Sequence, residues 1–276
     1  MKIQINQSDI QTIVDIPANE IPAIISGLSG KREAVILEPR TQGNGVLTDW
    51  RHVAAICRAG AAARYFKVGQ FLSLHSPVWG FIEWEIVRME EDGFWLVARR
   101  PVCAMQFDGE EKERDGKQRN IDGRDDWGSN NPLHCAPHKF LNSDKAAGQW
   151  WEASTDFDCP PAEHQELPGF LSGLPQDFLD CVKTVDVEME LPDCDGGGTA
   201  TQPLRFFLPS RQEIAPDNGK APFFKLKTLK KDGCIWWLRS PYVGHSYYVY
   251  NVNSSGALYI SSANYAYGCV PACRIG

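Results

Sequence analysis

The 276-residue chain lacks any apolar run long enough to cross a bilayer, for which about 20 consecutive apolar residues are needed. It also lacks an excess of positive charge, and its formal net charge of −7 argues against a nucleic-acid backbone as the main partner. The first residues, MKIQINQSDIQTIVDIP, contain no apolar core of the kind that a secretory signal requires. The sequence therefore predicts a protein without a membrane span, a nucleic-acid partner or a signal peptide, made in the cytoplasm.

Cysteine is present, but without the pairing that is typical of metal sites. The nine cysteines are an odd number, and in the absence of a signal peptide reduced thiols are the expected state. His134, Cys135 and His138 could share one helix face and hold zinc. No third and fourth ligand is obvious nearby, and Pro137 interrupts a regular helix. We therefore expect these residues to have a packing or surface role, and we expect neither a metal nor another cofactor.

Charge is concentrated in one segment. The chain as a whole is 43% hydrophobic and 23% charged, as in an ordinary soluble globular protein of one large domain or two smaller ones. Residues 107–127 carry charge of both signs and almost nothing apolar, which is typical of a solvated loop or a mobile insertion. A metal-binding acidic cluster is the alternative, but the interleaved Arg and Lys residues would oppose a cation.

Local patterns predict helices and strands along the chain. Residues 49–66 have apolar residues at helical spacing, and Asp49 suits the N-cap. The run WEIVRMEEDGFWLVARRPV predicts a β-hairpin with Asp92-Gly93 at the turn. A short helix is expected around residues 175–183, with Pro175 at its start. The other predicted strands are LRFFLPSRQEI, CIWWLRSPY, YYVYNVN, ALYIS and CVPACRI, and the turn Ser254-Ser255-Gly256 joins the third of them to the fourth.

The segment from Tyr242 to Gly268 contains no Asp, Glu, Lys or Arg. It holds seven of the eight tyrosines of the chain, with five serines, three asparagines and three glycines. One interpretation is a pair of β-strands and their turn, since Tyr and Val favour strands and Asn and Gly favour turns. The other is a binding surface, because Tyr supplies large, rigid contact area and Ser, Gly and Asn supply adaptable hydrogen bonds. Composition alone leaves both interpretations open.

Several motifs resemble a known family. They are WGSNNPLHCAPHKFLNSDKAAGQWW, FDCPPAEHQELPGFLSGLPQDFL, FLPSRQEI, WWLRSPY, NVNSSGAL and ANYAYGCVPACRI, with RAGAAARYFKVGQF in the N-terminal half. Together they resemble a domain family of gut bacteria and their prophages, some of whose members are variable proteins of diversity-generating retroelements. The ordered run of FLPSRQEI, WWLRSP and PACRI is the most specific part of this resemblance.

The resemblance implies an α+β fold of the C-type lectin-like type, shared with formylglycine-generating-enzyme-like domains. FLPSRQEI resembles the RLPTEAEWE element of that superfamily, and GCVPACRI resembles its terminal GFRPAL strand. Residues 128–276 would form the lectin-like domain, with a variable β-sheet and loop region at about residues 242–267. Residues 1–106 would be a helix and hairpin region packed on that domain, and residues 107–127 a charged mobile loop.

The resemblance also implies an origin for the unusual composition. In retroelement systems, adenines of a template repeat are copied with random replacement into the 3′ end of the gene. Asn codons of the AAY type can then become Tyr, Ser, His, Ile, Cys or Asp codons, but not Lys, Glu, Gln, Met or Trp codons. The segment from Tyr242 to Gly268 contains none of the last five residue types. The resemblance therefore favours a hypervariable binding surface.

This surface has a predicted set of ligand-contacting positions and a predicted set of buried ones. The ligand-contacting positions are Tyr242, His245, Ser246, Tyr247, Tyr248, Tyr250, Tyr259, Ile260, Ser261, Ser262, Asn264, Tyr265 and Tyr267, most of them facing outward. The side chains expected beneath them are Trp236, Trp237, Leu238, Val249, Val252, Leu258 and Ala263. Three glycines are expected at turns that need a permissive backbone, namely Gly244, Gly256 and Gly268.

The implied function is that of a diversified ligand-binding or receptor-binding protein, encoded by a phage or prophage, and not that of an enzyme. Its partner would be a protein or glycan ligand on a bacterial surface, reached from the virion or the cell surface by way of a phage particle. A homo-oligomer is an open alternative. The lectin calcium motif is absent, so calcium-dependent sugar binding does not carry over.

Two other functions compete with this one. A formylglycine-generating-type oxidase needs a cysteine pair that binds copper, and Cys269 and Cys273 are the candidates, since four residues apart on one strand they would face the same side. No Lys, Arg or His flanks Cys269 to favour its thiolate. Cys269 is also a departure from the family, which usually has Val after the glycine. A structural virion protein would instead use the Tyr-rich sheet as a subunit interface.

Overall fold

The protein is seen here in a computed structural model, which describes residues 47–111, 123–217 and 219–276. Before residue 47 it describes the backbone of five short strands, arranged in a three-stranded sheet of order β2-β1-β3 and a two-stranded sheet of β4 and β5. Their bounds are Lys2–Gln7 (β1), Ile10–Asp15 (β2), Ile36–Leu37 (β3), Arg40–Gln42 (β4) and Gly45–Leu47 (β5).

A six-stranded sheet joins both halves of the chain. Its order is β10-β18-β8-β7-β6, with β13 paired to β18 beside this path. The strands are Phe71–Ser76 (β6), Gly80–Glu90 (β7), Gly93–Ala98 (β8), Val182–Lys183 (β10), Phe206–Phe207 (β13) and Ala272–Ile275 (β18). Because the C-terminal β18 lies between β10 and β8, the sheet crosses the predicted boundaries at residues 106 and 128.

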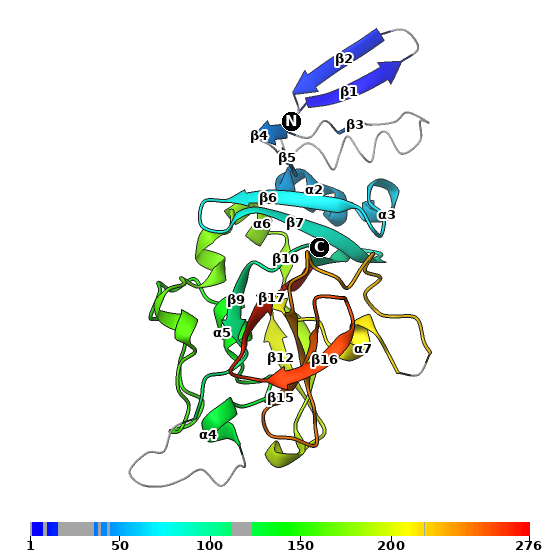
Figure 1. The fold of residues 1–276 in the computed structure, drawn as a ribbon. Helices are drawn as coiled ribbons and strands as arrows, with labels where there is room; N and C mark the ends of the chain where they lie inside the picture. Colours follow the sequence, from blue (N-terminus) through cyan, green and yellow to red (C-terminus); the bar gives the residue numbers. More distant parts are fainter. Residues whose placement is uncertain are drawn as a thin grey trace.

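A five-stranded sheet carries the tyrosine-rich segment. Its order is β16-β15-β14-β17-β9, so β16 and β9 are its two edges. The strands are Cys103–Gln106 (β9), Trp236–Pro241 (β14), Tyr248–Val252 (β15), Leu258–Ser262 (β16) and Ala266–Cys269 (β17). A separate hairpin is formed by Val185–Glu190 (β11) and Thr199–Leu204 (β12). Figure 1 shows the β15–β16 hairpin in orange, toward the end of the molecule opposite β6 and β7.

The helices are short. The α-helices are Trp50–Arg58 (α2), Ala62–Tyr65 (α3), Arg124–Trp127 (α4), Ala136–Leu141 (α5), Gln176–Leu179 (α6) and Arg211–Ile214 (α7). The 3-10 helices are Ala162–Gln165 (η1), Phe170–Gly173 (η2) and Asp193–Asp195 (η3). Helices and strands thus occur together, and strands cover more of the chain, which is the α+β character that the sequence predicts. No helix in the described residues has the length and apolar character needed to cross a membrane.

Four predicted elements need correction. The helix predicted over residues 49–66 is capped by Asp49 as expected, but it breaks between Arg58 and Ala62, where Gly60 adopts a φ of 63°. The hairpin turn is Glu91-Asp92, because Gly93 is already paired with Glu90. The helix expected around residues 175–183 ends at Leu179. The strand predicted as LRFFLPSRQEI is split into the end of β12, β13 and α7.

The last predicted strand, CVPACRI, also divides in two. Cys269 ends β17 in the five-stranded sheet, whereas Cys273 lies in β18 of the six-stranded sheet. The chain changes sheets at Val270-Pro271, and Pro271 cannot donate a ladder hydrogen bond. The expectation that the two cysteines face the same side of one strand is therefore wrong.

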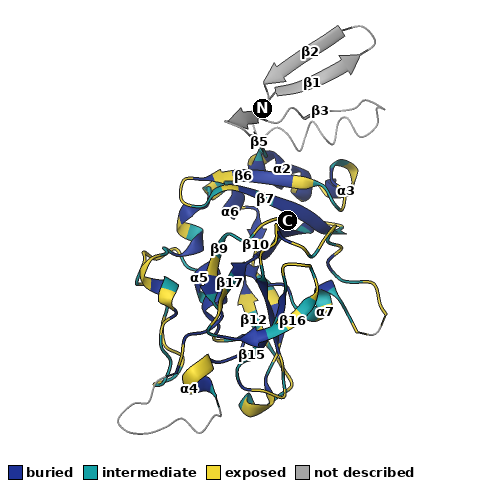
Figure 2. Ribbon diagram, in the orientation of Figure 1, coloured by how far each residue is buried: buried dark blue, intermediate teal, exposed yellow. Residues whose placement is uncertain are grey.

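One aromatic core lies beneath both sheets. Trp84 of β7, Phe178 of α6 and Phe206 of β13 contact one another with ring centroids 5.5–6.0 Å apart. All three side chains are fully buried. Figure 2 shows dark blue along the middle of β7, whereas the first part of β16 is teal and yellow. Because Trp84 is more than 90 positions before the other two residues in sequence, the core depends on long-range packing.

The charged segment 107–127 is not solvated at its two ends. Phe107, Asp108 and Glu111 are buried on one side of the segment, and Arg124 is buried on the other, while residues 112–122 lie outside the described part. Burial raises the pKa of the Asp108 carboxyl well above its usual value, although the backbone N–H of Ser129 donates a hydrogen bond to it. The prediction of a solvated loop is therefore wrong for these four residues, whereas Asp125, Asp126 and Trp127 at the end of the segment are exposed.

Candidate functional site

Five of the predicted ligand-contacting residues form one aromatic patch. The patch consists of Tyr242, His245, Tyr247, Tyr248 and Tyr250, on the loop between β14 and β15 and on β15 itself. His245 lies 5.3 Å from the ring of Tyr242 and 5.2 Å from that of Tyr248, and the Tyr247 and Tyr248 rings are 4.4 Å apart. Tyr242 and His245 are exposed and the other three rings are half-buried. The aromatic patch is thus a continuous surface.

Two residues beside the aromatic patch escaped the sequence analysis. Trp127 of α4 is 41% exposed, and its ring lies 6.4 Å from that of Tyr247. The guanidinium of Arg211, at the start of α7, lies 4.9 Å from the ring centroid of Tyr250, as in a cation–π contact. Both residues lie outside the tyrosine-rich segment, so its composition gave no signal for them. Trp127 belongs to the charged segment 107–127. Arg211 belongs to the motif FLPSRQEI, which was used only as an indication of the fold.

A buried asparagine holds the backbone beneath the aromatic patch. The Nδ2 group of Asn130 donates to the carbonyl oxygens of His245 at 2.7 Å and Tyr248 at 3.0 Å, and lies 3.4 Å from that of Tyr242. The backbone N–H of Asn130 donates to the carbonyl of Ser246 at 3.0 Å. Asn130 has no exposed surface, so water does not compete for these bonds.

A buried arginine supports the same loop. Nε of Arg124 donates to the Ser246 carbonyl at 3.1 Å, and its two terminal nitrogens donate to the Asp195 carboxylate at 3.1 and 2.6 Å. Nδ2 of Asn131 donates to the same carboxylate at 2.8 Å. Burial by itself would lower the pKa of Arg124, but hydrogen bonding to Asp195 and the charge of Asp195 outweigh it and raise that pKa. The guanidinium therefore stays charged. It donates to four acceptor atoms, namely the Ser246 carbonyl oxygen, the two Asp195 carboxylate oxygens and the Cys194 sulfur.

These anchors touch the backbone of the loop and not its side chains. Every hydrogen bond from Asn130 and Arg124 to the loop is accepted by a main-chain carbonyl. A carbonyl is present whatever side chain the residue carries. These hydrogen bonds therefore do not depend on side-chain identity at the exposed and half-buried positions that the anchors hold, His245, Tyr248 and Tyr242.

The remaining predicted positions do not all join this surface. Residues paired directly across an antiparallel ladder share a face, and β15 pairs Tyr250 with Ile260 and Asn251 with Tyr259. Tyr259 therefore faces the opposite side of the hairpin from Tyr250 and Ile260. The positions predicted to face outward therefore do not lie on one face of the hairpin, because side chains alternate along each strand.

Three predicted outward positions are internal. The serines concerned, Ser246, Ser261 and Ser262, are buried. Ser261 Oγ accepts hydrogen bonds from Nδ2 of Asn251 at 3.0 Å and from the hydroxyl of Tyr267 at 3.3 Å. Asn264 is half-buried, and its Nδ2 donates to the carbonyl of Asp126 at 3.1 Å. These residues build the scaffold.

The predicted buried set is confirmed with one exception. Leu258 is half-buried, whereas the other six residues of that set are buried. Gly256 has a φ of 91° in the turn between β15 and β16, as expected. Gly268 lies within β17 and not at a turn; a Cβ there would lie 2.6 Å from Cγ of Pro101. Close packing, and not a permissive φ, requires glycine at residue 268. Gly244 has an ordinary φ.

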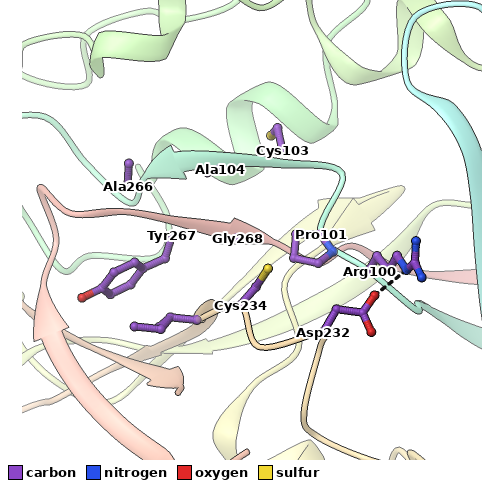
Figure 3. Close-up of a pocket in the computed structure, with 10 residues that line it drawn as sticks. Arg100, Pro101, Cys103, Ala104, Asp232, Cys234, Ala266, Tyr267 and Gly268 are labelled. Atoms are coloured by element: carbon purple, nitrogen blue, oxygen red, sulfur yellow. Dashed lines mark ion pairs between the residues drawn. The ribbon is translucent and has the colours of Figure 1, made fainter. Parts of the chain in front are cut away.

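Tyr267 lines an open, mainly apolar pocket of about 510 Å³, which β9 and β17 form together with Asp232, Cys234 and Ile235. Its ring packs 4.7 Å from that of the buried Trp237 and 5.8 Å from that of the exposed Tyr265. Figure 3 shows Tyr267 at one end of the pocket and the ion pair of Arg100 with Asp232, 2.5 Å long, at the other. The two predicted positions Tyr265 and Tyr267 thus belong to this pocket region, apart from the aromatic patch.

The cysteines do not form the pair that the oxidase alternative assumed. The direct neighbour of Cys269 is Cys103, its partner in the β17–β9 ladder, and not Cys273. Burial raises the pKa values of the Cys269 and Cys273 thiols well above their usual range, and hydrogen bonding to Cys103 raises that of Cys269 further. Because the thiolate is the reactive and metal-binding form, both cysteines are suited to packing.

His138 uses both of its ring nitrogens inside the protein. Nδ1 lies 3.1 Å from the carbonyl of Pro132, and Nε2 accepts the backbone N–H of Leu208 at 3.2 Å. The neutral imidazole with its proton on Nδ1 satisfies both contacts. No lone pair then remains for a metal, and the described residues contain no group of three potential ligands close enough to hold one. His134 is exposed, so the two histidines do not share a site.

His138 predicts a component of the pH dependence of stability. Burial, with a smaller contribution from the charge of Arg239, lowers the pKa of His138 to about 3. In the unfolded chain the ordinary value of about 6.5 applies, so the unfolded state binds an extra proton between these two values. We expect the contribution of neutral His138 to the free energy of unfolding to be fully present above about pH 6.5. As the pH drops toward 3, that free energy should fall by up to about 1.4 kcal/mol per pH unit. Urea unfolding of the wild type and of His138→Gln across this range measures it; equal pH slopes in the two proteins would contradict the assignment.

Comparison with known proteins places the chain in a family. No curated protein and no solved structure matches it. The model of a domain of unknown function, DUF6273, matches residues 115–276, which include α4, Asn130 and the whole aromatic patch. Since this match covers more than half of the sequence, the chain belongs to the DUF6273 family.

Proposed function

We propose that this chain is a diversified ligand-binding protein, encoded by a phage or prophage, which recognises its target through the aromatic patch. The observation that carries the proposal is the way in which the loop is held. Asn130 and Arg124 bind main-chain carbonyls, so the side chains of the patch can be exchanged without loss of these anchors. A surface under selection for change needs this separation of scaffold from display.

The chemistry of the patch suits the contact with a ligand. Tyr side chains combine a large apolar ring with a polar tip and lose little entropy when they are fixed. The patch adds the exposed Trp127 and the Arg211 guanidinium at its margins, and Trp, Tyr and Arg are the residues that most often dominate binding energy. We propose a protein or glycan on a bacterial surface as the ligand, and binding without catalysis as the activity.

The proposal includes a C-type lectin-like arrangement of the domain and a place on a virion or cell surface, reached through a phage particle. Its support is the order of the FLPSRQEI, WWLRSP and PACRI elements, which become α7, β14 and β18. The first of these motifs, FLPSRQEI, contains the capping box of Ser210 and Glu213, which stabilises the start of α7. The oxidase alternative loses support, since its two candidate cysteines lie in different sheets.

Sequencing the 3′ end of the gene in a population that carries it tests the proposal. We expect substitutions to be concentrated at adenine positions in the codons of the aromatic patch, with a template repeat and a reverse-transcriptase gene nearby. The codons of Asn130 and Asn131 are the matched control, because they encode the same residue type that retroelements exchange but serve the scaffold. Substitutions spread evenly over the gene, or no template repeat in the flanking DNA, would refute diversification.

Thermal and urea unfolding distinguish display positions from core positions. Tyr259 and Tyr265 are 62% and 48% exposed, so Tyr259→Ser and Tyr265→Ser should change the unfolding free energy by no more than about 0.5 kcal/mol. Leu258→Ala should cost only about 1–2 kcal/mol, because Leu258 is half-buried, whereas the buried control Leu238→Ala should cost roughly 2–5 kcal/mol. Tyrosine variants as unstable as Leu238→Ala would show that these rings belong to the core.

A further inference from the structure

We propose that the outer edge of β16 pairs with the same edge of a second copy of this chain, in an antiparallel dimer with two-fold symmetry. This goes beyond the proposed function and does not depend on it. Strand β16 ends the five-stranded sheet, and its partner β15 lies on one side only. Pairing two such edges would create one continuous ten-stranded sheet.

The phase of the β15–β16 ladder shows which backbone groups point outward. The N–H of Asn253 donates to the carbonyl of Ala257, and the N–H of Ala263 donates to the carbonyl of Tyr247. Along an antiparallel ladder, hydrogen-bonded pairs alternate with pairs that are not hydrogen-bonded to each other. Tyr259 and Ser261, which lie two and four residues after Ala257, therefore also direct their backbone groups toward β15. The backbone groups of Leu258, Ile260 and Ser262 therefore point away from the sheet.

At the centre of β16 the outward backbone groups are uncovered in the described part of the chain, whereas Ser262 at the end of the strand is buried. The Ser262 carbonyl accepts a bond from the N–H of Tyr265, but no described residue contacts the outward N–H and carbonyl groups of Ile260. The strand, Leu258-Tyr259-Ile260-Ser261-Ser262, also has no charge and no proline, which are the usual devices that keep an edge from pairing. Tyr259, 62% exposed, is the most exposed large hydrophobic side chain of the described residues.

Other sheet edges in this protein are covered. At β9, the opposite edge of the same sheet, the N–H of Gln106 donates to the Glu163 carboxylate at 3.2 Å, and the Gln106 side chain bonds to the backbone of Ala162 and Asn264. At β6, Thr48 exchanges two hydrogen bonds with the backbone of Ser73, at 3.0 and 2.8 Å. Among the described residues, the edge of β16 is therefore less covered than the edges of β9 and β6.

The pattern of β16 is complementary to itself. With the two-fold axis at Ile260, the two Ile260 residues become a hydrogen-bonded pair and exchange two N–H···O bonds. The N–H of Ser262 then meets the carbonyl of Leu258 in the other copy. The large Tyr259 lies opposite the small Ser261 of the second copy, so neither two tyrosines nor two charges oppose each other. This fit to a second copy is the reason for choosing it over an unrelated extended peptide.

Sedimentation velocity on the full chain, from about 1 μM to about 100 μM, tests the dimer. We expect a monomer–dimer equilibrium that Ile260→Pro weakens at least about tenfold, because proline removes the central outward donor but no bond to β15. Ile260→Lys, which retains the N–H and opposes two charges at the axis, should weaken it as well. Tyr259→Ser is the matched control, since it changes the neighbouring side chain and leaves the backbone pairing intact, and it should stay within about threefold.

Hydrogen exchange locates the interface independently. A peptide containing Ile260 should exchange more slowly at the high concentration than at the low one in the wild type, and at the same rate at both in Ile260→Lys. Far-UV circular dichroism confirms that each variant is folded before its sedimentation is interpreted. A wild-type monomer at every concentration would overturn the proposal. A dimer that neither Ile260 variant affects would also overturn it, because its interface would then lie elsewhere. Neither outcome would change the prediction that the aromatic patch binds a ligand.

Discussion

Asn130→Asp is expected to destabilise the protein by roughly 3 kcal/mol or more at neutral pH. The substitution replaces the Nδ2 donor with an oxygen that faces the carbonyls of His245 and Tyr248, at 2.7 and 3.0 Å from the present nitrogen. The side chain is fully buried, so no water can take over those contacts. The introduced carboxylate would be repelled by the carbonyl dipoles and would lose its own hydration.

The loss should shrink as the pH falls, because a protonated carboxyl can again donate one hydrogen bond. Asn253→Asp, in the turn between β15 and β16, is the matched control. The Oδ1 atom of Asn253 accepts bonds from the N–H groups of Ser255 and Ala257, and a carboxylate oxygen accepts equally well. We expect that variant to lie within about 0.5 kcal/mol of the wild type. Urea unfolding at two pH values measures both; equal stability of the two variants would mean that Asn130 does not hold the loop.

Glu213→Ala is expected to cost about 3–5 kcal/mol. Glu213 accepts a bidentate pair from Arg239, at 2.6 and 2.8 Å, and the arginine is only 5% exposed. Arg239 also donates to the carbonyls of Leu208 and Glu188, but these neutral acceptors do not balance its charge. Removal of the carboxylate would therefore leave a buried cation without an anion. It would also remove half of the capping box of α7, which carries Arg211 to the margin of the aromatic patch.

An exposed ion pair provides the comparison for Glu213→Ala. Arg99 and Glu83 are 2.7 Å apart, with side chains 47% and 30% exposed, so Glu83→Ala should cost about 0–1 kcal/mol. The double variant Arg239→Met, Glu213→Leu should recover much of the loss, because it removes the unpaired charge and fills the space. Chemical unfolding of the three variants decides the matter. If Glu213→Ala costs no more than Glu83→Ala, the buried pair contributes nothing beyond an ordinary surface pair.

Much of the tyrosine-rich hairpin could be predicted from the sequence alone. Strands β14, β15 and β16 lie where their residue patterns indicate them, and Gly256 occupies the turn between the last two. The side chain of Asp49 accepts the His52 N–H, as its N-cap position predicts. These successes share a cause: the hydrogen bonds and backbone angles concerned depend on residues no more than 16 positions apart, the separation of Trp236 from Val252.

Several features could not be predicted because they depend on partners far away in the sequence. Arg124 appeared to belong to a solvated charged segment, yet it is buried, because Asp195 and the Ser246 carbonyl are brought to it by folding. Cys269 was expected on one side of the same strand as Cys273, yet its neighbour is Cys103, more than 150 residues earlier. No local pattern contains the register that produces these contacts.

The sequence by itself determined the composition of the segment from Tyr242 to Gly268, the family motifs and the positions of the strands within the hairpin. Only the tertiary structure decided which side each residue faces. Tyr250 and Tyr259 belong to one hairpin and one residue type, yet the ladder turns them to opposite sides, because the pairing of Tyr250 with Ile260 fixes the alternation of the whole strand. It also decided that Asn130, distant in sequence and unremarkable in composition, holds the display loop through its carbonyl oxygens. Side-chain alternation and backbone hydrogen bonding across long sequence separations are the physical reason, since both are settled only when the strands meet.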